Sequence, residues 1–303
     1  MAGCSTVDAG QPGIRLTPLP DAPRSLGALQ VDAAYEIESA RPTVGGFSAL
    51  LRSGERLYLL SDRGRLFRAD IVDEKGVLTD LVDWVEATLP SRHGELDSES
   101  LAGLPGGRIV VGTESGQGLL TYRWDENGLA ELRETWPDPL PDAPPNKSIE
   151  SLASLPDESL LAISEGQHVG GNRVVAARVT RDAVTPCLYE TAEGFEPTGA
   201  DRVGNLLFVV ERQLSFLGGF ETRVATVDLP AEWTPGTVLK SREIARFGGA
   251  DTVAENYEGI SASQEAGGGY RLLLVSDDNF TSLQRSLLLD LVWRPDGKVA
   301  RAP

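Results

Sequence analysis

Carboxylate residues recur at regular intervals along this 303-residue chain, beside short apolar segments. Five segments share one pattern: a start position, a short strand, a turn, an apolar run and a closing acid. The start positions are Gly46, Glu99, Glu150, Thr198 and Glu258. The closing acids are Asp62, Glu114, Glu165, Glu211 and Asp277. Carboxylates gathered in such number must take up protons, pair with basic groups or bind cations.

Each of these segments is predicted to form a β-hairpin. The start positions lie 53, 51, 48 and 60 residues apart, and a period near this length built from short strands is typical of a β-propeller with one blade per repeat. In an antiparallel hairpin the end of the second strand lies beside the start of the first. If the strand before the turn is the innermost one, the acids of every blade meet at one mouth of the central channel.

The predicted fold is therefore an all-β propeller with five visible blade repeats, and six blades if the N-terminal segment forms a divergent one. We expect residues 1–28 to be an irregular leader and residues 29–303 to form a single propeller domain. Residues 29–37 alternate as a strand and could close the ring against the C-terminal blade. No amphipathic helical periodicity of ten or more residues is present.

Calcium is the cation that these acids favour. Hard oxygen ligands without matching histidines or cysteines suit Ca²⁺ better than zinc or copper. The candidate metal ligands are Asp62, Glu99, Glu114, Glu150, Glu165, Glu211, Glu258, Asp277 and Asp278. The alternative is structural, because carboxylates at strand ends also cap turns and bond neighbouring backbone groups.

Basic residues accompany the acids and could bind an anionic substrate. They are Arg63, Lys147, Arg202, Arg212 and Arg285. Guanidinium groups bind phosphate or carboxylate through two parallel hydrogen bonds, and a bound metal polarises a phosphoryl group and lowers the pKa of its water. Together these features indicate a phosphoester site, although simple charge balance with neighbouring acids explains the arginines equally well.

Four residues are candidates for proton transfer. Glu99 and Glu258 belong to the repeat pattern, while His93 and His168 lie in loops close to repeat acids. A histidine can act as a general acid or base near neutral pH, but each histidine could equally be an exposed loop residue without a role. The sequence contains no G-x-S-x-G elbow, P-loop or dinucleotide-binding fingerprint.

Composition limits the partners. The net charge is -17, from 28 basic and 45 acidic residues, which argues against nucleic acid or an anionic membrane surface as a partner. No apolar run is long enough for a transmembrane segment, and two cysteines are too few for a disulfide framework. Cys4, within Met1-Ala2-Gly3-Cys4-Ser5, either carries a lipid anchor after signal cleavage or is a chance cysteine. We expect a monomer.

Several motifs, taken in order, resemble the bacterial phytase-like esterase family. They are GGFSALL, LYLLSDRG, DSESLA, NKSIESLA, LLAISEG, PTGADR, LLFVVER, ENYEGISA and LLLVSDDNF, between residues 45 and 289. The resemblance implies a periplasmic or secreted propeller, often lipid-anchored, with esterase or phytase-like activity. In similar calcium-dependent propeller phytases, acids around the channel mouth bind calcium and basic residues bind phosphate.

Carried over by residue type, this resemblance assigns metal binding to seven acids and phosphate binding to three arginines. The acids are Asp62, Glu99, Glu150, Glu211, Glu258, Asp277 and Asp278, and the arginines are Arg63, Arg202 and Arg212. Few lysines lie near these positions, which disfavours a substrate as highly charged as inositol hexakisphosphate.

Three functions therefore stay open from the sequence. The leading one is a Ca²⁺-dependent hydrolase acting on a small anionic ester. The second is a non-enzymatic envelope propeller in which calcium is a structural clamp, and the third is a lactonase-like propeller with one channel metal. Ester hydrolysis with and without calcium separates the first function from the second, and lactone turnover with a single bound ion identifies the third.

Overall fold

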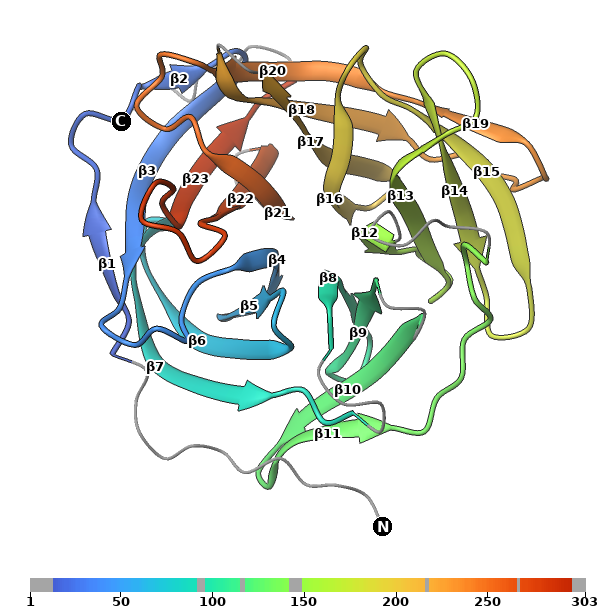
Figure 1. Ribbon diagram of the computed structural model, residues 1–303, viewed down its shortest axis with the longest axis horizontal. Helices are drawn as coiled ribbons and strands as arrows, with labels where there is room; N and C mark the ends of the chain where they lie inside the picture. Colours follow the sequence, from blue (N-terminus) through green and yellow to red (C-terminus); the bar gives the residue numbers. More distant parts are fainter. Residues whose placement is uncertain are drawn as a thin grey trace.

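Five sheets, antiparallel apart from one parallel strand pair, surround a central axis in the computed structural model (Figure 1). The structure describes residues 13–91, 96–114, 118–141, 149–215, 218–265 and 268–295, and these residues contain strands but no helix. The fold is thus an all-β propeller with five blades, as the repeat pattern predicted. No helix in the described ranges is long and apolar enough to cross a membrane.

The first three blades follow the chain in order from their innermost strand outward. Blade one contains β4 (Phe47–Ser53), β5 (Arg56–Ser61), β6 (Arg65–Glu74) and β7 (Val77–Thr88). Blade two contains β8 (Ser98–Leu104), β9 (Arg108–Thr113), β10 (Leu119–Asp125) and β11 (Gly128–Leu132). Blade three contains β12 (Ile149–Ser154), β13 (Leu160–His168), β14 (Arg173–Val179) and β15 (Val184–Glu190).

The last two blades depart from this simple chain order: one strand from the blade-four segment pairs with blade three, and N-terminal strands complete blade five. Blade four contains β16 (Glu196–Val203), β17 (Leu206–Ser215), β18 (Gly219–Asp228) and β20 (Arg242–Gly248), while β19 (Thr237–Lys240) pairs in parallel with β15 of blade three. Blade five contains β21 (Asn256–Glu265), β22 (Gly269–Asp277) and β23 (Leu287–Trp293). N-terminal strands β1 (Arg15–Pro18), β2 (Ser25–Leu26) and β3 (Leu29–Glu38) join blade five, because β3 pairs antiparallel with β23.

The first strand of each hairpin is the innermost one. β4, β8, β12, β16 and β21 each contact the next around the axis, and the last contacts the first (Figure 1). Two glycines permit this close approach: a Cβ on Gly259 would lie 2.7 Å from the Leu50 nitrogen, and one on Gly199 would collide with the Glu258 carbonyl. A small cavity of about 10 Å³ lies between the inner strands, which is about the lower limit for one water molecule.

Every inner strand carries a β-bulge at the same place. The hairpin register shifts between residues 47 and 49, 98 and 100, 149 and 151, 197 and 199, and 257 and 259. The inserted residues are Ser48, Glu99, Glu150, Thr198 and Glu258. A bulge re-aims the side chain of the inserted residue. The start position of blade one is therefore Ser48, two residues beyond the predicted Gly46.

Apolar side chains fill the spaces between neighbouring sheets, and a few buried ion pairs lie among them. Arg271 Nη1 lies 2.5 Å from Asp290 Oδ1, and these side chains are 6% and 0% exposed. The other oxygen of Asp290 accepts a hydrogen bond from the Leu78 nitrogen at 2.8 Å. Because Leu78 belongs to β7, this carboxylate links blade five to blade one.

We expect Asp290→Ala to lower the free energy of unfolding by about 3–5 kcal/mol, because it leaves a buried guanidinium and a buried N–H without their partner. Urea denaturation measures this loss. The control is Asp70→Ala, which removes an exposed partner of Arg56 at 3.6 Å and should change stability by less than about 1 kcal/mol. Equal losses in the two variants would contradict the structural role of Asp290.

Candidate metal centre and active site

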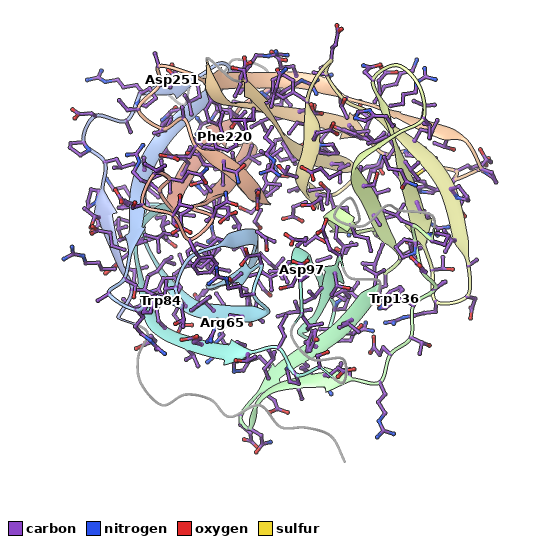
Figure 2. All side chains as sticks on the ribbon, in the orientation of Figure 1. Arg65, Trp84, Asp97, Trp136, Phe220 and Asp251 are labelled. Atoms are coloured by element: carbon purple, nitrogen blue, oxygen red, sulfur yellow. The ribbon has the colours of Figure 1, made fainter. Side chains whose placement is uncertain are left out.

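Carboxylates from four blades meet at one mouth of the propeller, where the inner strands begin and the second strands end. Figure 2 shows Asp97 close to the propeller axis. Ligand oxygens of Asp97, Glu99 and Glu114 all lie within 4.8 Å of one another. Glu99 is buried beside Asp97, and this neighbouring carboxyl group is one of the causes that raise the pKa of Glu99.

The acids interact in a closed sequence around this mouth. Asp97 interacts with Asp62 on one side and with Glu99 on the other. Glu99 also interacts with Glu150 and Glu258. Asp277 completes the circle, because it interacts with both Glu258 and Asp62. Glu114 and Glu165 interact with Glu150, and Asp278 interacts with Asp277. We call these nine acids the carboxylate ring: Asp62, Asp97, Glu99, Glu114, Glu150, Glu165, Glu258, Asp277 and Asp278.

Burial and mutual repulsion raise the pKa values of five ring members, Asp62, Glu99, Glu150, Glu258 and Asp277. Loss of hydration is the largest cause at each position, and neighbouring carboxylates add to it. The pKa values of Glu99 and Glu150 lie well above the ordinary glutamate value. Burial raises the pKa of Glu258 to about 8 and that of Asp277 to about 6. Glu258 therefore holds a proton near neutral pH unless a cation replaces it, whereas Asp277 loses most of its proton above about pH 6.

One arginine lies inside the ring. Arg212 Nη1 is 2.5 Å from Glu258 Oε1, and Nη2 is 2.9 Å from Glu165 Oε1. Its Nη1 also donates to Asn256 Oδ1. Burial alone would lower the pKa of Arg212, but Glu258 and Glu165 raise it above its ordinary value. Arg212 therefore joins blade four to blades three and five as a permanent positive charge.

Arg212, not Glu211, occupies the closing position of blade four. The residue before each bulge pairs with Ser61, Thr113, Ser164, Glu211 and Ser276, respectively. One residue later come Asp62, Glu114, Glu165, Arg212 and Asp277. Successive strand residues point to opposite faces, so Glu211 points away from the ring.

Glu211 is instead part of a buried structural cluster, which corrects its assignment as a metal ligand. Its Oε1 accepts hydrogen bonds from the Tyr189 hydroxyl at 2.5 Å and from Arg223 Nη1 at 2.6 Å. Its Oε2 accepts one from the Ala192 nitrogen at 3.2 Å. Both oxygens are used, and the side chain is fully buried.

Of the predicted substrate-binding arginines, Arg63 lies beside the ring. Its guanidinium stacks on the Phe280 ring at 3.5 Å from the ring centre. It lines a cavity of about 360 Å³ together with Arg65 and the ring members Asp62 and Asp97. Figure 2 shows Arg65 on blade one. This cavity places guanidinium groups next to the carboxylates, as an anionic substrate would require.

The other predicted basic residues lie elsewhere. Arg202 lies near the C-terminal end of β16 and lines a cavity at the opposite mouth. It therefore cannot act together with the ring. Arg285 donates to Glu255 Oε1 at 2.7 Å and to the Thr252 carbonyl at 2.8 Å. Its charge is used in holding a loop. Lys147 lies outside the described residues.

The residues that the structure describes contain one of the two predicted histidines, His168. His168 is on the rim of the same mouth, where its Nε2 lies 2.7 Å from Glu196 Oε1. The other Glu196 oxygen accepts a hydrogen bond from the Gly166 nitrogen at 3.0 Å. This carboxylate orients the imidazole, which stays 40% exposed. His93 lies outside the described residues.

The sequence prediction missed Asp97, a member of the Asp97–Glu99–Glu114 group. The signal was the Asp97-Ser98-Glu99 motif, in which two acids flank a buried serine immediately before the bulge. Residues two apart in a regular strand point to the same side, so this motif already indicated that Asp97 accompanies Glu99. The structure brings the carboxyl oxygens of both to the mouth, although the bulge interrupts the regular register there.

The fold and this mouth define a five-bladed propeller with an acidic, arginine-bridged site. Residues 42–280 match the family described as "Phytase-like: Esterase-like activity of phytase". The chain belongs to this family. No curated protein is detectably similar in sequence.

Comparison with solved structures finds matches at low sequence identity, with TM-scores below 0.5. One is Bacteroides ovatus Xyloglucan PUL GH43B, with 14% identity and a TM-score of 0.49, covering 88% of this chain and 56% of that one. A luciferin-regenerating enzyme has 12% identity and a TM-score of 0.43, with 95% and 93% covered. A virginiamycin B lyase from Staphylococcus aureus has 12% identity and a TM-score of 0.40, with 91% and 99% covered.

The metal-free protein should lose stability as the pH rises from about 5 to about 8. Glu258 and Asp277 have pKa values of about 8 and about 6 in the folded chain, above their ordinary values in the unfolded chain. The folded state therefore binds more protons in this window, and raising the pH favours unfolding. Melting temperatures at several pH values measure the trend.

Glu258→Gln should flatten this pH dependence, because the neutral amide has no proton to lose. Asp70→Asn is the control: its carboxylate is half-exposed, and its slope should match that of the wild type. A melting temperature that is constant or rising over the same window would contradict the repulsion within the ring.

Proposed function

We propose that the protein is a Ca²⁺-dependent esterase or phosphoesterase whose site is the carboxylate ring. The observation that carries this proposal is the convergence of nine carboxylates on one mouth around a single arginine, Arg212, among the described residues. The family description, with its esterase-like activity, supports hydrolysis as the reaction class.

The donor set fits calcium. Ca²⁺ takes six to eight oxygen ligands in flexible geometry, and Asp97, Glu99 and Glu114 offer such oxygens within 4.8 Å of one another. Burial and the neighbouring carboxylates raise the pKa of Glu99 well above its ordinary value, and a bound cation would offset this repulsion. Asp97, Glu99 and Glu114 would therefore hold the ion, and Glu150 lies next to them.

Calcium bound here would polarise the ester and lower the pKa of a coordinated water. The protein's own residues would bind and orient the substrate. Arg63 donates no hydrogen bond from its guanidinium to another described residue, while Phe280 fixes its plane. It can thus offer a fork of N–H donors to a phosphate or carboxylate in the adjoining cavity.

Proton transfer can be assigned within the ring. Glu258 has a pKa of about 8, so it can accept or donate a proton near neutral pH, as a general acid or base must. Glu99 is the nearest alternative, because its raised pKa has the same cause. His168 stands further out on the rim with Glu196 and would act only on a substrate that extends that far.

A structural use of the same ion is the second candidate. Ring members belong to blades one, two, three and five, so a bound cation would also tie these blades together. In that case the protein would be a calcium-stabilised binding propeller without turnover. A lactonase-like propeller with one channel metal is the remaining hydrolytic alternative.

The expected substrate is a small anionic ester, bound by a monomer. We also infer a periplasmic or secreted location with a lipid anchor at Cys4, which lies outside the described residues. Neither inference is needed for the chemistry of the ring. Fractionation of cells producing the chain, compared with a Cys4→Ser variant, tests the anchor.

Calcium should raise the melting temperature and should be required for hydrolysis of phosphomonoesters, carboxyl esters or lactones in a substrate screen. Glu99→Gln should weaken calcium binding by at least about tenfold, because it removes a charged ligand while preserving shape. Calorimetry with calcium and turnover assays measure both effects, with Asp70→Asn as the control. Turnover that survives complete removal of calcium would rule out the proposed hydrolase, and calcium-linked melting without turnover would favour the structural clamp.

Arg63→Gln should raise KM for a phosphoester by about tenfold or more, since hydrogen bonds to a charged group contribute more than neutral ones. Calcium affinity should stay unchanged, because Arg63 lies beside the ring and not within it. Arg56→Gln removes an exposed arginine on the same blade and should leave KM as it is. Equal KM values in all three proteins would exclude Arg63 from substrate binding.

A further inference from the structure

The opposite mouth of the propeller has a different chemical character. A cavity of about 270 Å³ opens there, where the inner strands end. Three arginines line it, together with Tyr58 and one acid, Asp201; the arginines are Arg52, Arg108 and Arg202. We call this set of five residues the basic mouth. It stands out in a chain whose net charge is -17.

Two of these arginines have hydrogen-bond donors to spare. Arg52 donates from Nε to the Gly54 carbonyl at 3.2 Å, and its terminal nitrogens reach no acceptor in the described part of the chain. Arg202 donates from Nε to the Ser154 carbonyl and from Nη1 to the Gly204 carbonyl at 3.0 Å. Its Nη2 has no acceptor among the described residues.

The third arginine and the acid are already paired. Arg108 lies 2.6 Å from Glu158 and 3.5 Å from Glu134. One oxygen of Asp201 accepts hydrogen bonds from the Ala262 nitrogen at 2.8 Å and the Ser261 hydroxyl at 3.0 Å. Its other oxygen accepts one from the backbone nitrogen of Arg202 at 2.8 Å. The Asp201 carboxylate therefore serves the backbone and not the guanidinium groups.

Neighbouring acids offset the positive charge of the partly buried Arg202 less than they offset the charges of Arg212 and Arg223. Burial lowers the pKa of Arg202, and the nearby acids do not restore it. Burial acts in the same direction on Arg212 and Arg223, but their carboxylate partners raise the pKa above its ordinary value. A partly buried cation without a matching anion is stabilised by an anionic ligand.

Tyr58 adds a donor of a different kind. Its side chain lines the cavity and is only 7% exposed. Its hydroxyl makes no hydrogen bond with any described residue, whereas the hydroxyls of Tyr35 and Tyr257 each donate to a backbone carbonyl. The Tyr58 hydroxyl is not among the buried polar atoms that lack a partner, so it is open to the cavity and can donate a hydrogen bond to a ligand there.

We propose that the basic mouth binds a small oxyanion, held by Arg52, Arg202 and the Tyr58 hydroxyl. A tetrahedral dianion and a carboxylate share the chemistry that guanidinium groups recognise, and a cavity of about 270 Å³ admits only a small molecule. The site is distinct from the carboxylate ring, because no ring member lines this cavity. Binding there needs no calcium and no turnover.

Isothermal titration calorimetry of the calcium-loaded full chain tests this site at constant ionic strength. Sodium sulfate is the probe for a tetrahedral dianion, and sodium succinate is the probe for a carboxylate. Arg202→Gln and Arg52→Gln should each weaken binding of the preferred probe by about tenfold, and Tyr58→Phe should weaken it by roughly threefold or more. Melting temperatures verify that each variant is folded.

Two control variants locate the anion. Arg56→Gln removes a positive charge near the same mouth without lining the cavity, and Arg63→Gln removes the arginine beside the carboxylate ring. Neither should change the affinity by more than about twofold, within the range of weak surface electrostatics. Equal weakening in all variants would mean non-specific attraction, loss only in Arg63→Gln would place the anion at the ring, and no heat from either probe would exclude the site.

Discussion

The carboxylates of the ring repel one another and have lost much of their hydration, so the fold must hold them together against a large electrostatic penalty. Three structural features do this. Bulges in the inner strands deliver Glu99, Glu150 and Glu258, strand ends deliver the other acids, and Arg212 bridges two of them. The raised pKa values express the repulsion that remains. A divalent cation would remove it, which is why we connect the ring to calcium.

The five bulges show how one backbone feature serves two purposes. In blades one and four the inserted residues are Ser48 and Thr198, whose hydroxyls donate to the carbonyls of Ser98 and Tyr257 on the next inner strand. These bonds fasten neighbouring blades. In the other three blades the same position carries a glutamate that faces the mouth. The repeat thus keeps its architecture while selected blades supply charge.

Much of this arrangement could be predicted from the sequence. The spacing of apolar runs and turns gave five hairpins, and antiparallel pairing placed their acids at one end. The wrong assignment of Glu211 arises because successive residues of a strand point to opposite faces. Aligning Glu211 with Asp62 was off by a single residue, and the position that faces the ring belongs to Arg212. Arg202 follows Asp201 at the far end of its strand, so its nearness to an acid in sequence concealed its location.

Other features required the three-dimensional structure. The basic mouth is assembled from residues near the ends of β4 and β16 and near the starts of β5 and β9, and no motif connects them in sequence. The close approach of the inner strands depends on Gly199 and Gly259, which have no side chain to block it. Pairing of β3 with β23, by contrast, agrees with the closing strand expected over residues 29–37, and it joins two parts of the chain that are far apart.

This pairing has a consequence for biosynthesis. Leu29–Glu38 is synthesised before the strands of blades one to four, and the strand that it pairs with, Leu287–Trp293, is synthesised after them. Until then the nascent chain carries an open β-edge, of the kind that invites pairing with other chains. Blades two, three and four can form while translation continues, but the circle is completed only after Leu287–Trp293 has left the exit tunnel.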